Sequence, residues 1–383
     1  MNAGGVLSHL GTMPVADFVA RYWQRRALCI RQAVAGFTNP VDETQLRALA
    51  ADPQIESRLV RQRAGRWELR HGPFAPRQIP SRRQADWTLL VQGVDLQVAA
   101  VAALAARFGF LPAARFDDVM ISLAGDGGGV GPHVDQYDVF LLQAQGRRRW
   151  RIARQFNPAL VEGAPLRVLS DFQSQQEWVL EPGDALYLPP GVAHEGVALG
   201  ECITISVGFR LPAWQEIIET WHDRQARSDA RTGRLHDATR RPTRDPARVP
   251  AAMIDAVHSQ LHRMPRTRRE AACALLENLS EPKPTVVFDA PARPLTSARF
   301  AQAALRRGIV LDLRSRLLFA ERNFAINGEV MTVERELRAA LRHLANHRSL
   351  PGLALQTHAA ASRGALLPLL YDWYGCGWLH LAA

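Results

Sequence analysis

Three side chains of the kinds that bind metal ions, His133, Asp135 and His194, occur in strand-like surroundings in this sequence. His133 and Asp135 begin an apolar segment that the alternation of its residues predicts as a β-strand. Residues two apart on a strand face the same side with Cα atoms roughly 6 to 7 Å apart, a separation that suits two ligands of one ion. His194 follows the turn residues EPGD and precedes a second predicted strand. Two histidines and one carboxylate leave the other positions of an ion open, as in non-haem Fe(II) oxygenases.

The spacing of His133 and Asp135 is by itself a weak signal, because a chain with twelve histidines contains about one His-x-Asp by chance. A surface histidine and aspartate at the end of a strand is the ordinary alternative. The glycine run before this pair, the apolar strand after it and the tight turn before His194 make the pattern more specific. Zinc is a further alternative, but three-ligand catalytic zinc sites more often carry three histidines, or histidine together with glutamate. The sequence therefore favours iron.

An oxygenase of this type needs an acidic co-substrate that chelates the metal and a fixed cation for its far carboxylate. The only lysine, Lys283, lies far away in a linker-like EPKP, so the cation must be an arginine. In GRRRWR, strand alternation places Arg148 and Trp150 on one face and the other three arginines on the opposite face. A buried guanidinium needs an anion, and a carboxylate bound through two hydrogen bonds matches it. We expect Arg148 to point inward, whereas a solvated basic edge accounts for most of the run.

Several polar residues near these positions are further candidates. Ser122, on the strand before the glycines, and Thr204 or Ser206, on the strand after His194, could add hydroxyl contacts to a co-substrate. Each is equally compatible with an ordinary strand position. Asp126, in the glycine run, could receive a guanidinium from a substrate, and Tyr137 lies close to it in sequence. The usual reason for an aspartate beside glycine is a turn.

The segments GPHVDQYDVFLLQAQGRRRWRI, LEPGDALYLPPGVAHEG and SVGFR resemble the bacterial ribosomal oxygenases, which are JmjC-type cupin enzymes. The resemblance implies Fe(II), with 2-oxoglutarate and O2 as co-substrates, and hydroxylation of an arginine in a ribosomal protein of the large subunit. It implies metal ligands at His133, Asp135 and His194, the co-substrate carboxylate at Arg148, and Ser122 near that co-substrate. Eukaryotic relatives modify histidine instead, so a histidyl hydroxylase is an alternative.

The same resemblance implies an α+β fold in three parts. A double-stranded β-helix, the JmjC or cupin jelly-roll, would form a catalytic domain over residues 1–210. A helical dimerisation segment would follow over residues 211–279, giving a homodimer, and a winged-helix-like domain would occupy residues 280–383. Within these parts, the apolar residues 87–108 predict one buried helix, and residues 250–279 predict a single helix after a polar, arginine-rich connector.

The composition indicates the cellular location of the protein and the kind of partner it has. The net charge of +10 is carried almost wholly by arginine, which fits an anionic neighbourhood such as a ribosome, although codon bias is the plain alternative. The four cysteines show no Cys-x-x-Cys spacing, which argues against structural zinc and disulfides and for a reducing cytosol. No apolar run is long enough to span a bilayer, and no leader pattern starts the chain, so we expect a cytoplasmic protein without membrane contact.

Two other classes of function stay open at this point. A cupin hydrolase or isomerase could use the same ligands with zinc or manganese and would not depend on 2-oxoglutarate. A non-catalytic module could bind nucleic acid through the winged helix with an affinity that falls with salt. The intact ligand set disfavours the second class, and fold alone does not support it.

Overall fold

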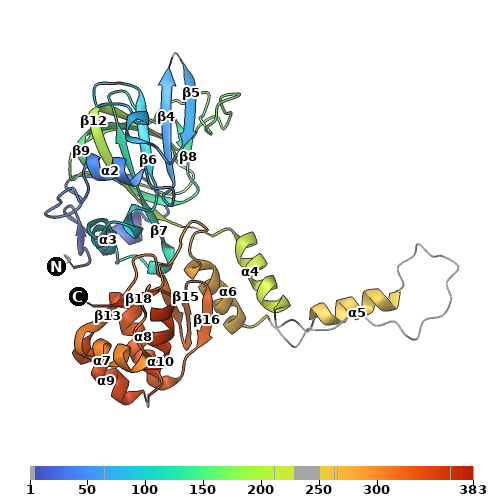
Figure 1. Cartoon of the computed structure of the whole chain (residues 1–383). Helices are drawn as coiled ribbons and strands as arrows, with labels where there is room; N and C mark the ends of the chain where they lie inside the picture. Colours follow the sequence, from blue (N-terminus) through green and yellow to red (C-terminus); the bar gives the residue numbers. More distant parts are fainter. Residues whose placement is uncertain are drawn as a thin grey trace. The chain divides into compact units, whose positions relative to one another are not determined.

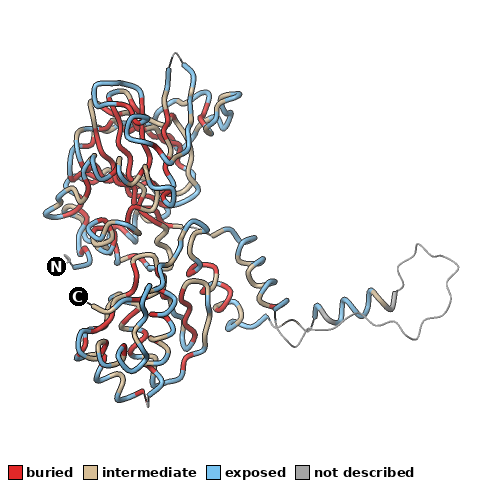
Figure 2. The backbone as a smooth tube through the Cα atoms, viewed as in Figure 1, coloured by how far each residue is buried: buried red, intermediate tan, exposed pale blue. Residues whose placement is uncertain are grey.

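The computed structural model of the chain describes residues 5–63, 65–210, 212–227, 251–262, 264, 266–362 and 364–382. Its contacts divide the chain into two compact units (Figure 1). The first comprises Met1–Leu211 and Lys283–Phe288, and the second comprises Pro212–Pro282 and Asp289–Ala383. Each unit has its own buried interior (Figure 2). The arginine-rich connector predicted before residue 250 lies almost wholly outside the described residues.

The first unit is built on a ten-stranded antiparallel sheet. Its main path runs β3-β11-β9-β12-β7-β6-β4-β5, with β10 paired to β9 and β8 paired to β12. The strands are β3 (Leu28–Ile30), β4 (Ser57–Arg63), β5 (Arg66–His71), β6 (Trp87–Val91), β7 (Phe116–Ala124), β8 (His133–Val134), β9 (Asp138–Ala153), β10 (Gln176–Leu180), β11 (Ala185–Leu188) and β12 (Ala193–Phe209). Around them lie the hairpin β1 (His9–Leu10) and β2 (Met13–Pro14), helices α1 (Val15–Arg21), α2 (Glu43–Leu49) and α3 (Ala99–Ala106), and the short turns η1 (Pro76–Gln78), η2 (Val94–Leu96) and η3 (Ala113–Arg115).

The two long strands β9 and β12 give the sheet its double-stranded β-helix form. The halves of each strand pair separately, and the register shifts between Leu199 and Thr204. Gly146 lies opposite this irregularity with φ +64°, and a Cβ there would lie 2.1 Å from the carbonyl oxygen of Glu201. Only glycine tolerates this close approach and this backbone conformation. The bend lets one strand pair cross from one sheet layer to the other, so the predicted jelly-roll fold is confirmed.

The two faces of these strands bury different kinds of side chain. Phe140 and Phe209 face outward into a large apolar cluster with Phe18 and Tyr187, where α1 and its neighbours cover the sheet. On the opposite face, alternate residues of β9 and β12 point into the space between the layers. There a smaller apolar cluster contains Trp150 and several leucines and valines. This inner face also carries the polar residues that form the candidate site.

The prediction of one buried helix over residues 87–108 is wrong in its first half. Trp87–Val91 forms the fully buried strand β6, paired on one side with β4 and on the other with β7. Gly93, with φ +62°, turns the chain into η2, and helix α3 begins only at Ala99. A strand buried on both faces shows no alternation, so hydrophobic periodicity cannot distinguish it from a buried helix.

The second unit begins with helices. Its helices are α4 (Trp214–Ala226), α5 (Ala251–His262), α6 (Arg268–Ser280), α7 (Ser297–Arg307), α8 (Arg335–His347), α9 (Gly352–Ala361) and α10 (Leu366–Gly375). The single helix predicted for residues 250–279 is therefore two helices. Thr267 starts the second, since its hydroxyl accepts a hydrogen bond from the amide of Glu270 at 3.2 Å. Helices α4 and α6 contact each other through Arg224 and Glu277, at 2.5 Å.

The remaining part of this unit has the helix and hairpin content of a winged helix. The meander β14 (Leu317–Ala320), β15 (Asn323–Ile326) and β16 (Glu329–Thr332) turns at Asn327 and Gly328, both with positive φ, as the Asn-Gly pair predicts. The other small sheet joins β13 (Gly308–Leu311) to β17 (Ser349–Pro351) and β18 (Leu379–Leu381). Within the described ranges, no helix has both the length and the apolar character needed to cross a bilayer.

Candidate metal and co-substrate site

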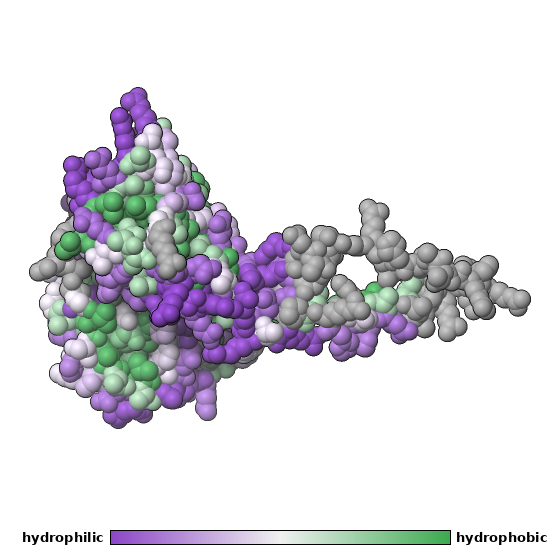
Figure 3. All heavy atoms as spheres, turned by 90° about the horizontal axis from the view of Figure 1, so that it is seen from below, coloured by the Kyte–Doolittle hydropathy of each residue, from purple (hydrophilic) through white to green (hydrophobic). Residues whose placement is uncertain are grey.

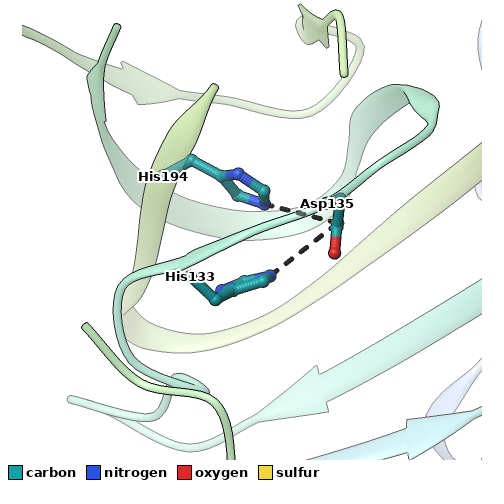
Figure 4. Close-up of side chains that lie close together, drawn as sticks. All are labelled: His133, Asp135 and His194. Atoms are coloured by element: carbon teal, nitrogen blue, oxygen red, sulfur yellow. Dashed lines mark ion pairs between the residues drawn. The ribbon is translucent and has the colours of Figure 1, made fainter. Parts of the chain in front are cut away.

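The side chains of His133, Asp135 and His194 converge in the first unit (Figure 4). One Asp135 carboxylate oxygen, Oδ2, lies 3.8 Å from His133 Nε2 and 3.7 Å from His194 Nε2. The two imidazole rings lie 4.2 Å apart between centroids. Among the residues that the structure describes, this is the one group of three ligand side chains whose donor atoms all lie within 4.8 Å of one another. Such a spacing leaves room for a single ion between them.

The backbone brings these residues together by pairing β8 with β12. His133 lies directly opposite His194 in that pairing. Asp135, however, follows the end of β8 and does not continue the strand, so the predicted unbroken strand from His133 into VFLLQ is wrong. Its position is held instead by its own carbonyl oxygen, which accepts a hydrogen bond from the amide of Gly191 at 2.8 Å. That bond ties Asp135 to the turn before β12.

Each histidine is oriented by a hydrogen bond from its other ring nitrogen. His133 Nδ1 donates to the carbonyl oxygen of Gly131 at 2.9 Å, and His194 Nδ1 donates to that of Val192 at 3.0 Å. These bonds fix the tautomer that leaves each Nε2 with a free lone pair facing Asp135. Burial, and next the charge of His133, lower the pKa of His194 to about 4. His194 is therefore a neutral ligand at neutral pH.

Arg148 lies on the inner face of β9, as the alternation of GRRRWR predicts. It is 4% exposed, whereas the neighbouring Arg147 is exposed to solvent. In the described structure, its Nε and Nη2 atoms are buried and have no hydrogen-bond partner. The residue opposite it on β12, Ala198, has a small apolar side chain that offers the guanidinium no hydrogen-bond acceptor. A buried guanidinium with free donors is costly unless an anion binds it.

The predicted hydroxyl residues lie on the same inner face. Ser122 and Thr204 are opposite each other in the pairing of β7 with β12, and both are buried, as is Ser206. The Thr204 hydroxyl donates to Gln143 Oε1 at 3.0 Å, so it already has a protein partner. Ser122 Oγ has a long contact of 3.5 Å with the carbonyl oxygen of Thr204. The Ser122 hydroxyl therefore has a weaker hydrogen bond within the protein than the Thr204 hydroxyl, and it is more available to a ligand.

The glycine run before His133 lies against the protein's own backbone. A Cβ on Gly128 would meet the carbonyl oxygen of Trp87 at 2.1 Å, and one on Gly129 would meet that of Gly196 at 2.6 Å. Asp126 is exposed in this loop, and its Oδ1 accepts a hydrogen bond from the amide of Gly200 at 2.7 Å. This hydrogen bond joins Asp126 to β12, far along the chain, and is not a local turn contact; the exposure of Asp126 leaves it accessible to a substrate.

Tyr137 lies beside the metal-ligand cluster. Its side chain is 37% exposed. Partial burial of its hydroxyl raises the pKa of Tyr137, and the adjacent Asp135 carboxylate raises it further by charge and by a hydrogen bond. Tyr137 is therefore neutral across the physiological range, and it donates its proton toward Asp135.

Sequence reasoning gave no role to Trp150 or Gly196, which lie opposite each other at the centre of the inner face. The alternation that places Arg148 inward also places Trp150 inward, and that signal could have identified it. The sequence does not indicate that Gly196 lies opposite Trp150, because this depends on the register between β9 and β12, which shifts near Gly146.

Together, the jelly-roll fold and the His-Asp-His cluster define a cupin of the JmjC type. The JmjC domain model matches residues 103–217, and the ROXA-like winged helix model matches residues 262–380. The solved structure of YcfD, a ribosomal oxygenase from Escherichia coli in complex with cobalt and 2-oxoglutarate, is 31% identical, with a TM-score of 0.81. That match covers 98% of this chain and 100% of that one. The chain therefore belongs to the ribosomal oxygenase family.

Two curated relatives agree with this family. A ribosomal protein uL16 3-hydroxylase from Escherichia coli (strain K12) is 40% identical over 219 residues, which are 55% of this chain and 57% of the relative. A probable ribosomal oxygenase from Haemophilus influenzae is 33% identical over 207 residues, 53% of this chain and 51% of that protein. In sequence, the chain spans about half the length of the curated relatives that it matches.

Proposed function

We propose that this protein is an Fe(II)- and 2-oxoglutarate-dependent hydroxylase that modifies an arginine side chain of a large-subunit ribosomal protein. The observation that carries the proposal is the combination of two features on one inner face. One is a cluster of two histidines and one carboxylate, and the other is a buried arginine with unpartnered donors. The activity of the Escherichia coli relative, a ribosomal protein uL16 3-hydroxylase, and the complex of YcfD with cobalt and 2-oxoglutarate support both the reaction and the kind of substrate.

The donor set fits Fe(II). Two neutral imidazoles and one carboxylate occupy one side of an ion and leave the remaining positions for a chelating 2-oxo acid and O2. The bound metal would supply the oxidising power for attack on a C–H bond, while the protein orients the target and excludes water. In this proposal His133, Asp135 and His194 hold the metal. The low pKa of His194 keeps its Nε2 available without competition from a proton.

Arg148 would hold the distal carboxylate of 2-oxoglutarate. On β12, His194 and Ala198 are four residues apart, so the metal end and the arginine end of the inner face are separated by roughly 13 Å of strand. A five-carbon diacid bonded to the metal at one end and ion-paired at the other spans a gap of this order. Ser122 and Ser206 would add hydroxyl contacts to the same co-substrate.

The substrate side of the proposal rests on Asp126 and Tyr137. Asp126 is an exposed carboxylate in the glycine loop, and Tyr137 offers a neutral aromatic ring beside Asp135. Carboxylates and ring faces are the groups that bind a guanidinium. An arginine entering the site could thus be held by charge at one end while its methylene chain passes the metal.

Two further parts of the proposal concern the setting of the protein. We place it in the cytoplasm, where ribosomal proteins are made, and we propose a homodimer formed through the helical segment 211–279. Helices α4 and α5 carry exposed apolar side chains among polar ones. In Figure 3, which colours the surface by hydropathy, green atoms lie among purple ones on the arm of the molecule that extends beside the grey residues. The exposed apolar side chains are Trp214, Ile218, Ile254, Val257 and Leu261. Such residues gain stability when a second copy covers them.

The test is an assay of succinate formation with Fe(II) and 2-oxoglutarate, offering ribosomal proteins of the same cell as substrates. Mass spectrometry should find a gain of one oxygen on an arginine of one large-subunit protein. The same gain on a histidine would correct the target residue but not the chemistry. Absence of succinate with every substrate, in protein shown to bind the metal, would refute the proposed reaction.

A further inference from the structure

The inner face of the β9 and β12 pair forms three successive rows. His194 lies opposite Ile152, Gly196 lies opposite Trp150, and Ala198 lies opposite Arg148. Trp150 therefore occupies the middle row, between the proposed metal end and the arginine end. Its ring centroid lies 6.1 Å from that of His194 and 5.7 Å from the guanidinium carbon of Arg148. No other row separates these two functional groups along the strands.

Gly196 allows the Trp150 ring to lie close against the backbone of β12. A Cβ at this position would meet three indole carbon atoms between 2.7 and 2.9 Å, closer than real side chains approach. Its φ is outside the left-handed region, so the requirement for glycine here is steric and not conformational. The absence of a side chain at Gly196 thus lets the indole pack directly against the backbone of β12 in the middle row.

The indole nitrogen of Trp150 has no hydrogen-bond partner in the described structure, although the residue is only 5% exposed. The other deeply buried tryptophan of this unit, Trp87, shows the usual situation. Its Nε1 donates to the carbonyl oxygen of Gln84 at 2.8 Å. Buried polar atoms are almost always paired, so an orphaned N–H indicates a missing partner. Arg148, whose guanidinium carbon lies 5.7 Å from the ring, is also an unsatisfied donor and cannot supply an acceptor.

We propose that Trp150 is a co-substrate-positioning residue. Its indole N–H donates a hydrogen bond to an oxygen of bound 2-oxoglutarate, and its ring supports the carbon chain between the metal and Arg148. Both unpartnered donors on this face, the indole and the guanidinium, then receive acceptors from one dianion. This inference rests on the proposed function, because it takes 2-oxoglutarate as the occupant of the site.

The test uses full-length protein loaded with Zn(II), which binds the same donors and leaves NMR signals sharp. The nine tryptophans give indole N–H signals, and the one missing in Trp150→Phe identifies Trp150. Adding 2-oxoglutarate should shift that signal in the wild-type protein. By calorimetry, Trp150→Phe should bind 2-oxoglutarate about tenfold more weakly, because it keeps the ring but loses one bond to a charged acceptor. Its Zn(II) affinity should stay within about twofold.

The matched control is Trp178→Phe, which removes an indole N–H from the residue paired with Trp150 on β10. It should bind 2-oxoglutarate like the wild type. If wild-type protein binds 2-oxoglutarate but the Trp150 signal does not move, the indole has another partner, such as an internal water, and the inference is wrong. If wild-type protein does not bind 2-oxoglutarate at all, the proposed function itself fails.

Discussion

A half-buried arginine in the second unit, Arg314, and a buried arginine in the first unit, Arg148, differ in how their charge is satisfied. In the second unit, Arg314 donates through Nε and Nη2 to the two oxygens of Asp312 at 2.7 and 2.9 Å, and through Nη1 to Asp289 at 2.9 Å. These hydrogen bonds raise the pKa of Arg314. In the first unit, Arg148 is buried more deeply, yet two of its nitrogens have no partner in the described structure.

This difference indicates that the charge of Arg314 stabilises the fold, whereas the charge of Arg148 serves to bind a ligand. A buried cation whose partners are all supplied by the chain adds to the fold, and removing one partner is costly. A buried cation without partners lowers the stability of the unliganded protein and raises its affinity for an anion. Variants of the two arginines and their surroundings should therefore affect different measurements.

The largest expected effect is on the metal-ligand cluster. His133→Ala removes one of two neutral nitrogen ligands, so we expect hydroxylation to fall by at least about a thousandfold and metal content to fall with it. Metal analysis and the succinate assay measure both. The second unit should keep its thermal stability, since His133 belongs to the first. Substantial turnover by this variant would remove the iron assignment.

Arg148→Met should raise the Kd for 2-oxoglutarate by about a hundredfold, because the distal carboxylate loses its ion pair. The same change should leave the unliganded Tm unchanged or higher, since it removes an unpaired buried charge. Arg147→Met, on the solvent side of the same strand, is the matched control and should change neither quantity. A lower Tm together with an unchanged Kd would mean that Arg148 is structural.

Asp312→Ala should have the opposite pattern. It removes the two carboxylate oxygens that accept hydrogen bonds from Nε and Nη2 of the half-buried Arg314, so we expect the second unit to lose about 2 kcal/mol of unfolding free energy. Denaturant unfolding measures this loss. Binding of 2-oxoglutarate below the unfolding transition should match the wild type. A large change in that binding would break the distinction between the two arginines.

The two units should also respond to acid in different pH ranges. The pKa of His194 is lowered to about 4, so the metal-free first unit loses about 3 kcal/mol as pH falls from 6.5 toward 4, where the unfolded chain binds the extra proton. Burial alone would raise the pKa of Asp312, but hydrogen bonds from Arg314 and His380 outweigh burial and lower it to about 2.

The contribution of Asp312 is present above pH 3.8 and is lost as pH falls through 2. The free energy of unfolding should be measured for the metal-free variants across pH 2 to 7. In His194→Gln it should depend less on pH between 4 and 6.5, and in Asp312→Asn it should depend less on pH between 2 and 3.8. A weaker pH dependence of both variants in the same range would contradict the assignment.

The sequence predicts the site better than the path of the chain around it. Residue types and spacing are enough to predict that His133, Asp135 and His194 lie close together. Strand alternation is enough to predict that the side chain of Arg148 points inward and is buried. The position of Asp135 beyond the end of β8 could not be read, because a short bridge strand and a turn can place a side chain as an extended strand does.

The misassigned helix over residues 87–108 has a different cause. Trp87–Val91 pairs with β4 on one edge and with β7 on the other, and all of its residues are buried. This burial depends on parts of the chain that are distant in sequence, so the local residues do not reveal it. The place of Gly196 against Trp150 is likewise set by register and not by local sequence. The separation of α5 from α6 was missed even though Thr267 is a recognisable helix start.

The most direct test of the site is the visible charge-transfer absorption that a 2-oxo acid gives when it chelates Fe(II) without oxygen. Wild-type protein with Fe(II) should develop this band on titration with 2-oxoglutarate, and Arg148→Met should need a much higher concentration. His133→Ala should not develop it. A band of equal strength in His133→Ala, or none in the wild type, would contradict a common site formed by the three ligands and Arg148.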